Sequence, residues 1–472
     1  MSKFMRRAWR GLNLERITVS RALALAFGAW VAAATLEVAT SLDLTPEANA
    51  TLINVINGGK YAPASGGGGG ALTCATAEDL AEIDWHEDSG AWGDADPIVC
   101  AELPTTTSTQ TCTSFSECQS EIEIDGVQLT IDADWGPSNV LTIDDNAGDG
   151  VHDIDVIVLS TSAIGTIQLG SFGCTQPHDD IRIRGSTPGS YSGGIVGQLR
   201  IDQCVTDLTI DGIATNGDTT GASGYSGAEG YHCFHTDGAR LTVLNVLALC
   251  AAHAWIGSAT DVVINNSSFM AGAATTTEVG YVEGWGIRNS HGKITIIDSD
   301  IRTTRYVPLR THSTNGGSTT DELMFVLRSI LLNYAEARTA WEYPDANGAV
   351  GGLLGPGLGA VIQDSHIYAF ADSDCGLGAQ IDIATSYSRH DGNTFYEIDD
   401  ANNSMDFSQS WLDGEQATAA SNWGGTHTDT GNTFTTAAAA PAWGGAGDPT
   451  TLPMANGMTL QYAGQGNCGA IP

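Results

Sequence analysis

Short apolar runs recur along the middle of the chain and predict β-strands. From about residue 136, runs such as VLTI (140–143), DVIVL (155–159), LTIDG (208–212) and ITIID (294–298) succeed one another. Gly, Asn, Asp or Ser bounds each run, as expected where strands meet turns. No helical period of useful length competes with these runs after residue 136. The pattern predicts an all-β fold made of many short strands.

The spacing of the runs indicates a solenoid. The runs that begin at Leu208, Leu241, Val262, Ile294, Phe325 and Val361 are 33, 21, 32, 31 and 36 residues apart. A step of 21 residues is enough for one bare coil, and the longer steps add loops. Propeller blades repeat at about 40 to 45 residues, and sandwich strands follow one another at about 8 to 12. We therefore expect a right-handed, single-stranded parallel β-helix whose apolar side chains stack from coil to coil.

The rest of the chain divides into four further segments. Residues 1–34 predict a signal peptide or N-terminal anchor, because six basic residues precede the apolar run ALALAFGAWVAAA (22–34). Residues 35–73 form a Gly-rich linker. Residues 74–135 carry four of the ten cysteines and predict a disulfide-rich cap. The β-helix is expected over residues 136–415, and an irregular tail over residues 416–472 packs along the solenoid or caps its end.

The cysteines and the leader together predict a secreted or cell-surface protein. An even number of cysteines in an exported chain indicates disulfides, whose pairing the sequence leaves open. Cys-x-x-Cys pairs and zinc-ligand spacing are both absent from the sequence. The apolar run of the leader is too short to cross a bilayer, and no later segment approaches twenty apolar residues, so no stable transmembrane segment is expected after the leader. A monomer and a trimeric fibre both remain open.

The charge of the chain is strongly negative, with one local exception. There are 19 Lys and Arg residues against 55 Asp and Glu, a formal net charge of −36, which argues against nucleic acid or an anionic membrane as a partner. Residues 288–338 nevertheless contain more cations than acids. The cations of this stretch are Arg288, Lys293, Arg302, Arg305, Arg310, Arg328 and Arg338. A solubilising charge distribution would not concentrate cations in this way, so the stretch is a candidate binding site.

Superposing the coils by their strand starts predicts two columns of polar side chains. One column contains His253, Arg305, Glu336 and Arg338, and the other contains His235, Arg288 and either Arg310 or His312. Trp255, Trp285 and Trp341 lie in the same coils, and aromatic rings beside polar groups suit sugars. The alternative is that the arginines neutralise stacked acidic turns and that the tryptophans fill the core.

Three stretches of these coils resemble the pectate-lyase-like superfamily of right-handed β-helices. They are ATDVVINNSSF (259–269), residues 283–313 from EGWGIRNS to RTHS, and FVLRSILLNYAEARTAWEY (325–343) followed by AVIQDSHIYAF (360–370). The resemblance covers about 110 residues. It implies β-elimination on a uronate polymer, in which an arginine removes the proton α to the carboxylate. In that family calcium or other cations neutralise the carboxylate, so Ca²⁺ is a possible cofactor.

The resemblance assigns roles to two residues and departs from the family at others. By position, Arg338 matches the catalytic arginine and Glu283 the first calcium-binding aspartate. Ala340 and Tyr343 stand where the family has a proline and a second arginine, and Asn265-Asn266 replaces an Asp-His pair. A complete R-x-x-P-x-R motif occurs instead one coil earlier, from Arg305 to Arg310.

We therefore expect a protein that binds an anionic, uronate-containing extracellular polysaccharide, with β-elimination as the reaction its arginines would support. Arg305, Arg310 and Arg338 would act as base and carboxylate clamps, with His312 or His253 as the acid. Arg288, His253, Trp285, Trp341 and Glu336 would contact the substrate, and Glu283 would bind the metal. Two alternatives remain: a non-catalytic cell-surface or virion fibre adhesin, and a glycoside hydrolase. A hydrolase would need paired carboxylic acids, such as Asp298 with Asp300 or Glu336 with Asp372 or Asp374.

Overall fold

The structure is a computed structural model of the whole chain, in which all the residues described below belong to one compact unit, Pro63–Pro472. The structure describes residues 100–136, 138–143, 150–170, 176–217, 232–251, 253–257, 260–274, 286–289, 293–303, 308–311, 323–333, 353–354, 359–371, 387–399, 408–423, 426–454 and 460–461. Predictions about other residues lie outside the described part of the chain.

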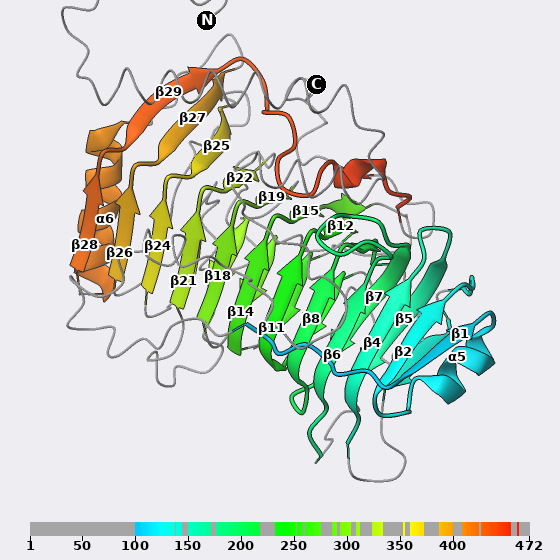
Figure 1. Cartoon of the computed structure of the whole chain (residues 1–472). Coiled ribbons are helices and arrows are strands. Elements are labelled where there is room, and N and C mark those ends of the chain that lie inside the picture. Colours follow the sequence, from blue (N-terminus) through cyan, green and yellow to red (C-terminus); the bar gives the residue numbers. More distant parts are fainter. Residues whose placement is uncertain are drawn as a thin grey trace, which may run out of the picture. The chain divides into compact units, whose positions relative to one another are not determined.

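Two long sheets of parallel strands form the fold (Figure 1). The first sheet has twelve strands in the order β1 (Ser108–Cys112), β2 (Val127–Ile131), β4 (His152–Val158), β6 (Asp179–Arg184), β8 (Thr206–Asp211), β11 (Ala239–Leu244), β14 (Thr260–Asn265), β18 (Lys293–Ile297), β21 (Leu323–Leu327), β24 (Gly359–Gln363), β26 (Tyr387–Asp391) and β28 (Thr426–Thr430). Neighbouring strands come from successive passes of the chain, so the chain winds as a solenoid. The predicted all-β parallel solenoid is confirmed at this level.

The second sheet begins with β3 (Val140–Ile143), β5 (Ala163–Leu169) and β7 (Ile195–Ile201) and then divides. The start of β7 pairs with the long branch: β9 (Ala214–Thr215), β12 (Leu247–Cys250), β15 (Ser268–Ala271), β19 (Asp300–Thr303), β22 (Ile330–Asn333), β25 (His366–Ala371), β27 (Thr394–Asp399) and β29 (Thr433–Ala437). The end of β7 pairs with the short branch: β10 (Phe234–Thr236), β13 (Trp255–Gly257), β17 (Ile287–Asn289), β20 (Leu309–Thr311) and β23 (Leu353–Leu354). A separate antiparallel pair joins β16 (Ala273–Ala274) to β30 (Leu460–Gln461).

The core is built from columns of apolar side chains that repeat at the same strand position. One column of the first sheet runs through Leu129, Val156, Ile183, Ile210, Val243, Ile264, Ile296, Val326 and Ile362, all of them buried. Each rung covers the apolar surface of the rung before it, which is how a solenoid without a globular core is stabilised. The next residue of this column, His390, is polar.

A buried ladder of side-chain hydrogen bonds joins the coils where the first sheet turns into the long branch. The backbone N–H of Ser267 donates to Oγ of Ser299 over 3.2 Å, and the N–H of Ser299 donates to Oγ of Ser329 over 3.1 Å. The ladder continues through Ser365 and Asn393. Each serine Oγ also donates back to its own strand, as in the 2.8 Å bond from Ser299 to the carbonyl of Ile297. These bonds satisfy turn N–H groups that have no strand partner.

Replacing Ser299 with alanine should therefore destabilise the protein by about 1 to 3 kcal/mol, because the buried N–H of Ser267 loses its acceptor. Denaturant unfolding followed by circular dichroism measures this change. Ser120→Ala is the matched control, because the hydroxyl of Ser120 is exposed and donates only to the carbonyl of Glu117. That control should cost less than about 0.5 kcal/mol. Equal losses of stability in the two variants would contradict a stabilising role for the serine ladder.

The residue before each of these serines has a left-handed backbone conformation. Asn266, Asp298 and Asp364 have a φ of 47°, in a region that Asn and Asp adopt more readily than most residues. Arg328 occupies the same position with φ of 47°, where its guanidinium donates two 2.9 Å bonds to Asp298 of the preceding coil. The ion pair therefore accompanies an unusual backbone position for arginine.

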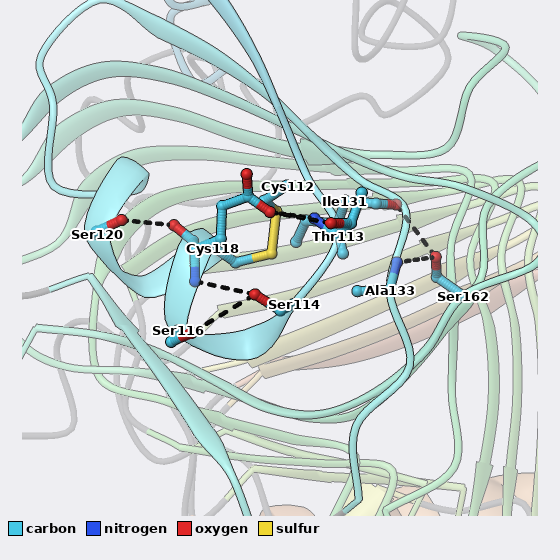
Figure 2. The surroundings of a disulfide bond; sticks show 10 residues. Cys112, Thr113, Ser114, Ser116, Cys118, Ser120, Ile131, Ala133 and Ser162 are labelled. Carbon is cyan, nitrogen blue, oxygen red and sulfur yellow. Dashed lines mark hydrogen bonds between the residues drawn. A yellow bond between two sulfur atoms is a disulfide. The ribbon is translucent and has the colours of Figure 1, made fainter.

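A short helix and a disulfide stand at the first end of the core (Figure 2). The helix α5 (Phe115–Glu121) begins at Ser114, whose Oγ accepts from the N–H of Glu117. Cys118 of α5 is bonded to Cys112 of β1, and both cysteines are buried in the core. Because β1 pairs with β2, the parallel sheet already begins at Ser108, earlier than the predicted start at residue 136. The sequence around these cysteines has little periodicity, so the hydrophobic pattern did not predict this strand.

The other end of the solenoid also extends beyond the predicted boundary. Strands β28 and β29 continue both sheets to Ala437, although the repeat pattern was expected to end at residue 415. The helix α6 (Gln409–Trp423) precedes them and lies beside β28 (Figure 1). Leu412 of α6 is buried in the core. The helix has no clear apolar face, since Leu412 and Gln416 are its only buried residues among those described, which explains why the sequence pattern did not predict it.

Residues 438–454 turn back along the outer face of the long branch, as predicted for the tail (Figure 1). Trp443 and Leu452 pack against an apolar cluster that includes Leu247, Met270 and Leu332. The segment ends in a short 3-10 helix, η3 (Pro449–Thr451). Contacts far apart in sequence therefore tie the last coil to the middle of the solenoid.

A second extended segment, residues 100–107, crosses the first sheet from β11 toward β2 (Figure 1). The N–H of Glu102 donates to the carboxylate of Asp207 over 3.2 Å, and the N–H of Thr105 donates to that of Asp153 over 2.5 Å. Asp180 lies between these two aspartates at the same strand position. Burial, followed by the neighbouring carboxylates Asp179 and Asp207, raises the pKa of Asp180 to about 6.

Disulfides hold the described cysteines. Besides Cys112–Cys118, Cys233 is bonded to Cys250, and Cys100 and Cys204 also take part in disulfides. Within the described ranges, we find no helix that combines the length and the apolar character needed to span a membrane.

Candidate functional site

The short branch aligns basic residues at one rung position. Arg200 of β7 pairs with His235 of β10, which pairs with Ile256 of β13; Arg288 of β17 and Arg310 of β20 follow at the same position. We call these five positions the cation column, although one of them, Ile256, is apolar and only the other four are basic. Adjacent strands lie about 4.8 Å apart, so the column from His235 to Arg310 is roughly 14 Å long. The predicted alignment of His235, Arg288 and Arg310 is confirmed for the backbone, and His312 lies outside the described residues.

The alternation of each strand separates the cation column from the core. The residues immediately before it are Leu199, Phe234, Trp255, Ile287 and Leu309, all of which are buried. Side chains of successive β-residues point to opposite faces, so the column belongs to the face turned away from the core. Arg200 is itself buried, whereas His235 is partly exposed. Of these two described side chains, His235 is therefore the one that a ligand could reach.

Trp255 belongs to the core rather than to a sugar-binding surface. It is fully buried, and its ring stacks on Phe234 with the ring centroids 5.3 Å apart. Phe234 in turn contacts Phe269 of the long branch, at 6.0 Å between centroids. For Trp255 the structure thus supports the alternative that tryptophans fill the core. Trp255 directly precedes Ile256 on β13, so its side chain lies on the core side of the strand.

His253 lies beside the column but is poorly accessible. It is 5% exposed, and its ring centroid is 4.7 Å from that of His232, which is also buried. Its carbonyl accepts a hydrogen bond from the N–H of Cys233, and the carbonyl of His232 accepts one from the side chain of Gln198. Because both imidazoles are packed together, His253 does not present an open surface for a sugar. The rest of its predicted column, Arg305, Glu336 and Arg338, lies outside the described residues.

Two cations of the basic stretch are paired with acidic residues. Arg302 is 2% exposed and forms a two-bond ion pair with Asp300, at 2.7 and 2.8 Å. Its guanidinium also donates to the carbonyls of Pro441 and Ala442 and lies 3.8 Å from the ring centroid of Trp443. Arg328 pairs with Asp298, as described above. These two arginines neutralise neighbouring carboxylates, so part of the basic stretch serves the fold.

The same ion pairs argue against Asp298 and Asp300 as the acids of a hydrolase. Asp300 is fully buried and receives bonds from Arg302 and from the N–H of Gly444. Burial raises its pKa, against the opposing effect of Arg302. Asp298 is engaged with Arg328. A pair of accessible carboxylic acids facing one substrate is not formed here, which is a correction to that expectation.

The remaining predicted site residues are not described in this structure. Arg305, His312, Glu283, Trp285, Glu336, Arg338, Trp341, Asp372 and Asp374 lie outside the described ranges. For Arg288 and Arg310 the backbone position is described. Among the described residues, no group of three or more His, Cys, Asp and Glu side chains is arranged to hold a metal ion. Calcium therefore stays a prediction that rests on Glu283.

Sequence reasoning did not place Arg200 in the column. The interval from Arg200 to His235 is 35 residues, similar to the other long coil steps, so the alignment could have been extended by one coil. Arg200 lies outside the basic stretch of residues 288–338, so local charge alone does not point to it.

Comparison with known proteins gives no match: no family model, no curated protein and no solved structure is similar to this chain. The resemblance to the pectate-lyase-like superfamily accordingly remains a prediction from the sequence motifs.

Proposed function

We propose that this protein is an extracellular, right-handed β-helix that binds an anionic, uronate-containing polysaccharide along the cation column. The observation that carries the proposal is the register of His235, Arg288 and Arg310 at one rung position of the short branch. The chain as a whole has a net charge of −36, so most of its surface would repel a polyanion. A column of cations in such a protein gives a polyanion one preferred path.

The chemistry of arginine supports a carboxylate ligand. A guanidinium binds a carboxylate through two parallel N–H···O bonds, and it keeps its charge at any physiological pH. Rungs that follow one another along the solenoid axis suit an extended polymer with a carboxylate on each sugar. Arg302 and Arg328 are excluded from this role because Asp300 and Asp298 already occupy their guanidinium groups.

Cleavage by β-elimination is the reaction we propose for the same surface. A base removes the proton α to the carboxylate, the bond from the β-carbon to the glycosidic oxygen breaks, and an acid protonates the leaving oxygen. Arg305 or Arg338 would be the base, Arg288 and Arg310 would stabilise the charge on the carboxylate, and His312 would be the acid. His253 is the weaker candidate for the acid because it is buried against His232.

Binding is tested by titrating the protein with pectate, alginate, hyaluronan and chondroitin, with neutral dextran as the control polymer. Arg288→Ala and Arg310→Ala should each weaken binding roughly 10-fold to 100-fold, the range expected for loss of a charged hydrogen-bond pair. Arg328→Ala is the matched control and should leave the affinity unchanged, since its partner is Asp298. Equal affinities of all three variants would contradict the proposal.

Cleavage is tested separately by the ultraviolet absorbance of the unsaturated product, with calcium and with a chelator. A rise in absorbance that is lost in Arg305→Ala or Arg338→Ala would identify the base. If the polymer binds but the absorbance does not rise, the protein binds the polysaccharide without cleaving it by β-elimination.

A further inference from the structure

A histidine is buried without a hydrogen-bond partner near the last end of the core. His390 of β26 is 0% exposed, and among the described residues neither ring nitrogen has a partner. It continues the aliphatic column of the first sheet, between Ile362 of β24 and Asp429 of β28. A buried polar group without a partner costs free energy, so its retention at this position calls for an explanation.

The groups around His390 come from the last coil and from the helix beside it. On β28, Asp429 is the register partner of His390, and His427 is the register partner of Ser388, with Nδ1 of His427 2.8 Å from Oγ of Ser388. From α6, Gln409 donates to the carboxylate of Asp429 and to Asp413. Gln416 of α6 is also buried, and its Nε2 has no partner among the described residues. The neighbours of His390 on its own strand, Arg389 and Asp391, are paired with each other.

These surroundings favour the neutral imidazole. Burial lowers the pKa of His390 to about 4; Asp429 opposes this effect, and His427 adds to it. An exposed histidine has a pKa of about 6.5, so between pH 6.5 and 4 a proton binds the open state but not the closed state. Acid in this range therefore favours any state in which His390 meets water.

The strand β28 is the last strand of the first sheet, so it has a strand partner on one side only within the described part of the chain. The helix α6 is attached through Leu412, through Trp411 on Phe395 at 6.2 Å, and through Gln409. Segments with few buried contacts open locally before the whole protein unfolds.

We propose that the C-terminal end of the solenoid is an acid-sensitive closure, in which protonation of His390 releases α6 and β28 from β26 while the preceding coils stay folded. This inference is independent of the polysaccharide proposal, since its residues lie outside the cation column. Opening would expose Phe395 and the edge of the first sheet at β26.

Amide hydrogen–deuterium exchange of the full chain, read by mass spectrometry between pH 7.5 and 4, tests this closure. After correction for intrinsic exchange rates, the opening constant of α6 and β28 should rise about 100-fold over this range. The strands β8, β11 and β14 should not show this rise. Exchange must be read segment by segment, because a second group responds to the same pH range. The pKa of Asp180 is raised to about 6, so lowering the pH stabilises the folded state around Asp180 in the first sheet. A global unfolding curve would combine this stabilisation with the destabilisation expected at His390.

Two variants and one direct measurement decide the outcome. His390→Phe should abolish the acid-dependent opening, and His366→Gln, which changes an exposed histidine, should retain it. If His390→Phe does not fold, exchange at the imidazole C2 of the wild-type protein gives the pKa of His390 without a substitution. A pKa near 6.5, an unchanged acid response in His390→Phe, or simultaneous opening of all coils would each overturn the proposal.

Discussion

Replacing Arg302 with alanine is expected to lower the free energy of unfolding by about 3 to 5 kcal/mol. The guanidinium of Arg302 is buried against Asp300, and its removal leaves an uncompensated carboxylate in the protein interior. The substitution also removes the bonds to the carbonyls of Pro441 and Ala442 and the contact with Trp443. Residues 438–454 should therefore detach from the long branch before the solenoid unfolds. Limited proteolysis and denaturant unfolding measure the two effects.

The chain supplies its own control for this prediction. Arg328 also pairs with an aspartate, but the side chains of Arg328 and Asp298 are 23% and 28% exposed. This pair is partly exposed, so Arg328→Ala should have a smaller effect than Arg302→Ala and should leave residues 438–454 in place. The double variant Asp300→Asn, Arg302→Met should recover part of the loss, because it removes both buried charges. A loss in Arg302→Ala no larger than that in Arg328→Ala would contradict this account.

The strand spacing predicted much of the register, and one error shows its limit. The spacing predicts Leu208, Leu241, Val262 and Ile294 as equivalent strand starts, and the structure pairs them directly. The next start, Phe325, is displaced by one residue, since Ile294 pairs with Met324. The run LMFVL (323–327) is apolar throughout, and its residues 324–327 are buried on both faces of the sheet. Without alternation, a sequence does not reveal which residue of a strand faces the core.

The cation column could be predicted in part, because its basis is strand register. His235, Arg288 and Arg310 are separated by whole coils, and regular coils place them together. The roles of Arg302 and Arg328 could not be predicted in the same way. The carbonyls that bind Arg302 lie about 140 residues further along the chain, in a segment without a repeat. Local charge density therefore overestimated the number of cations available to a ligand.

Trp255→Ala is expected to destabilise the protein by about 3 to 5 kcal/mol, the usual cost of removing a fully buried large aromatic side chain. Trp255 fills the core of the short branch and stacks on Phe234, so its loss leaves a cavity directly beneath the cation column. Native domains are stable by about 5 to 15 kcal/mol, so this single change removes a large share of the total. Thermal and denaturant unfolding measure the loss.

Trp255→Phe separates packing from direct contact with a ligand. The phenyl ring can keep the stack on Phe234, and it removes an indole N–H that has no hydrogen-bond partner among the described residues. Its cost should therefore be smaller than that of Trp255→Ala, because the phenyl ring leaves a smaller cavity. Affinity for the anionic polysaccharide should be unchanged in Trp255→Phe, because the ring lies on the core side of the strand. A variant with normal stability and weakened binding would show that Trp255 contacts the polymer, and would contradict its placement in the core.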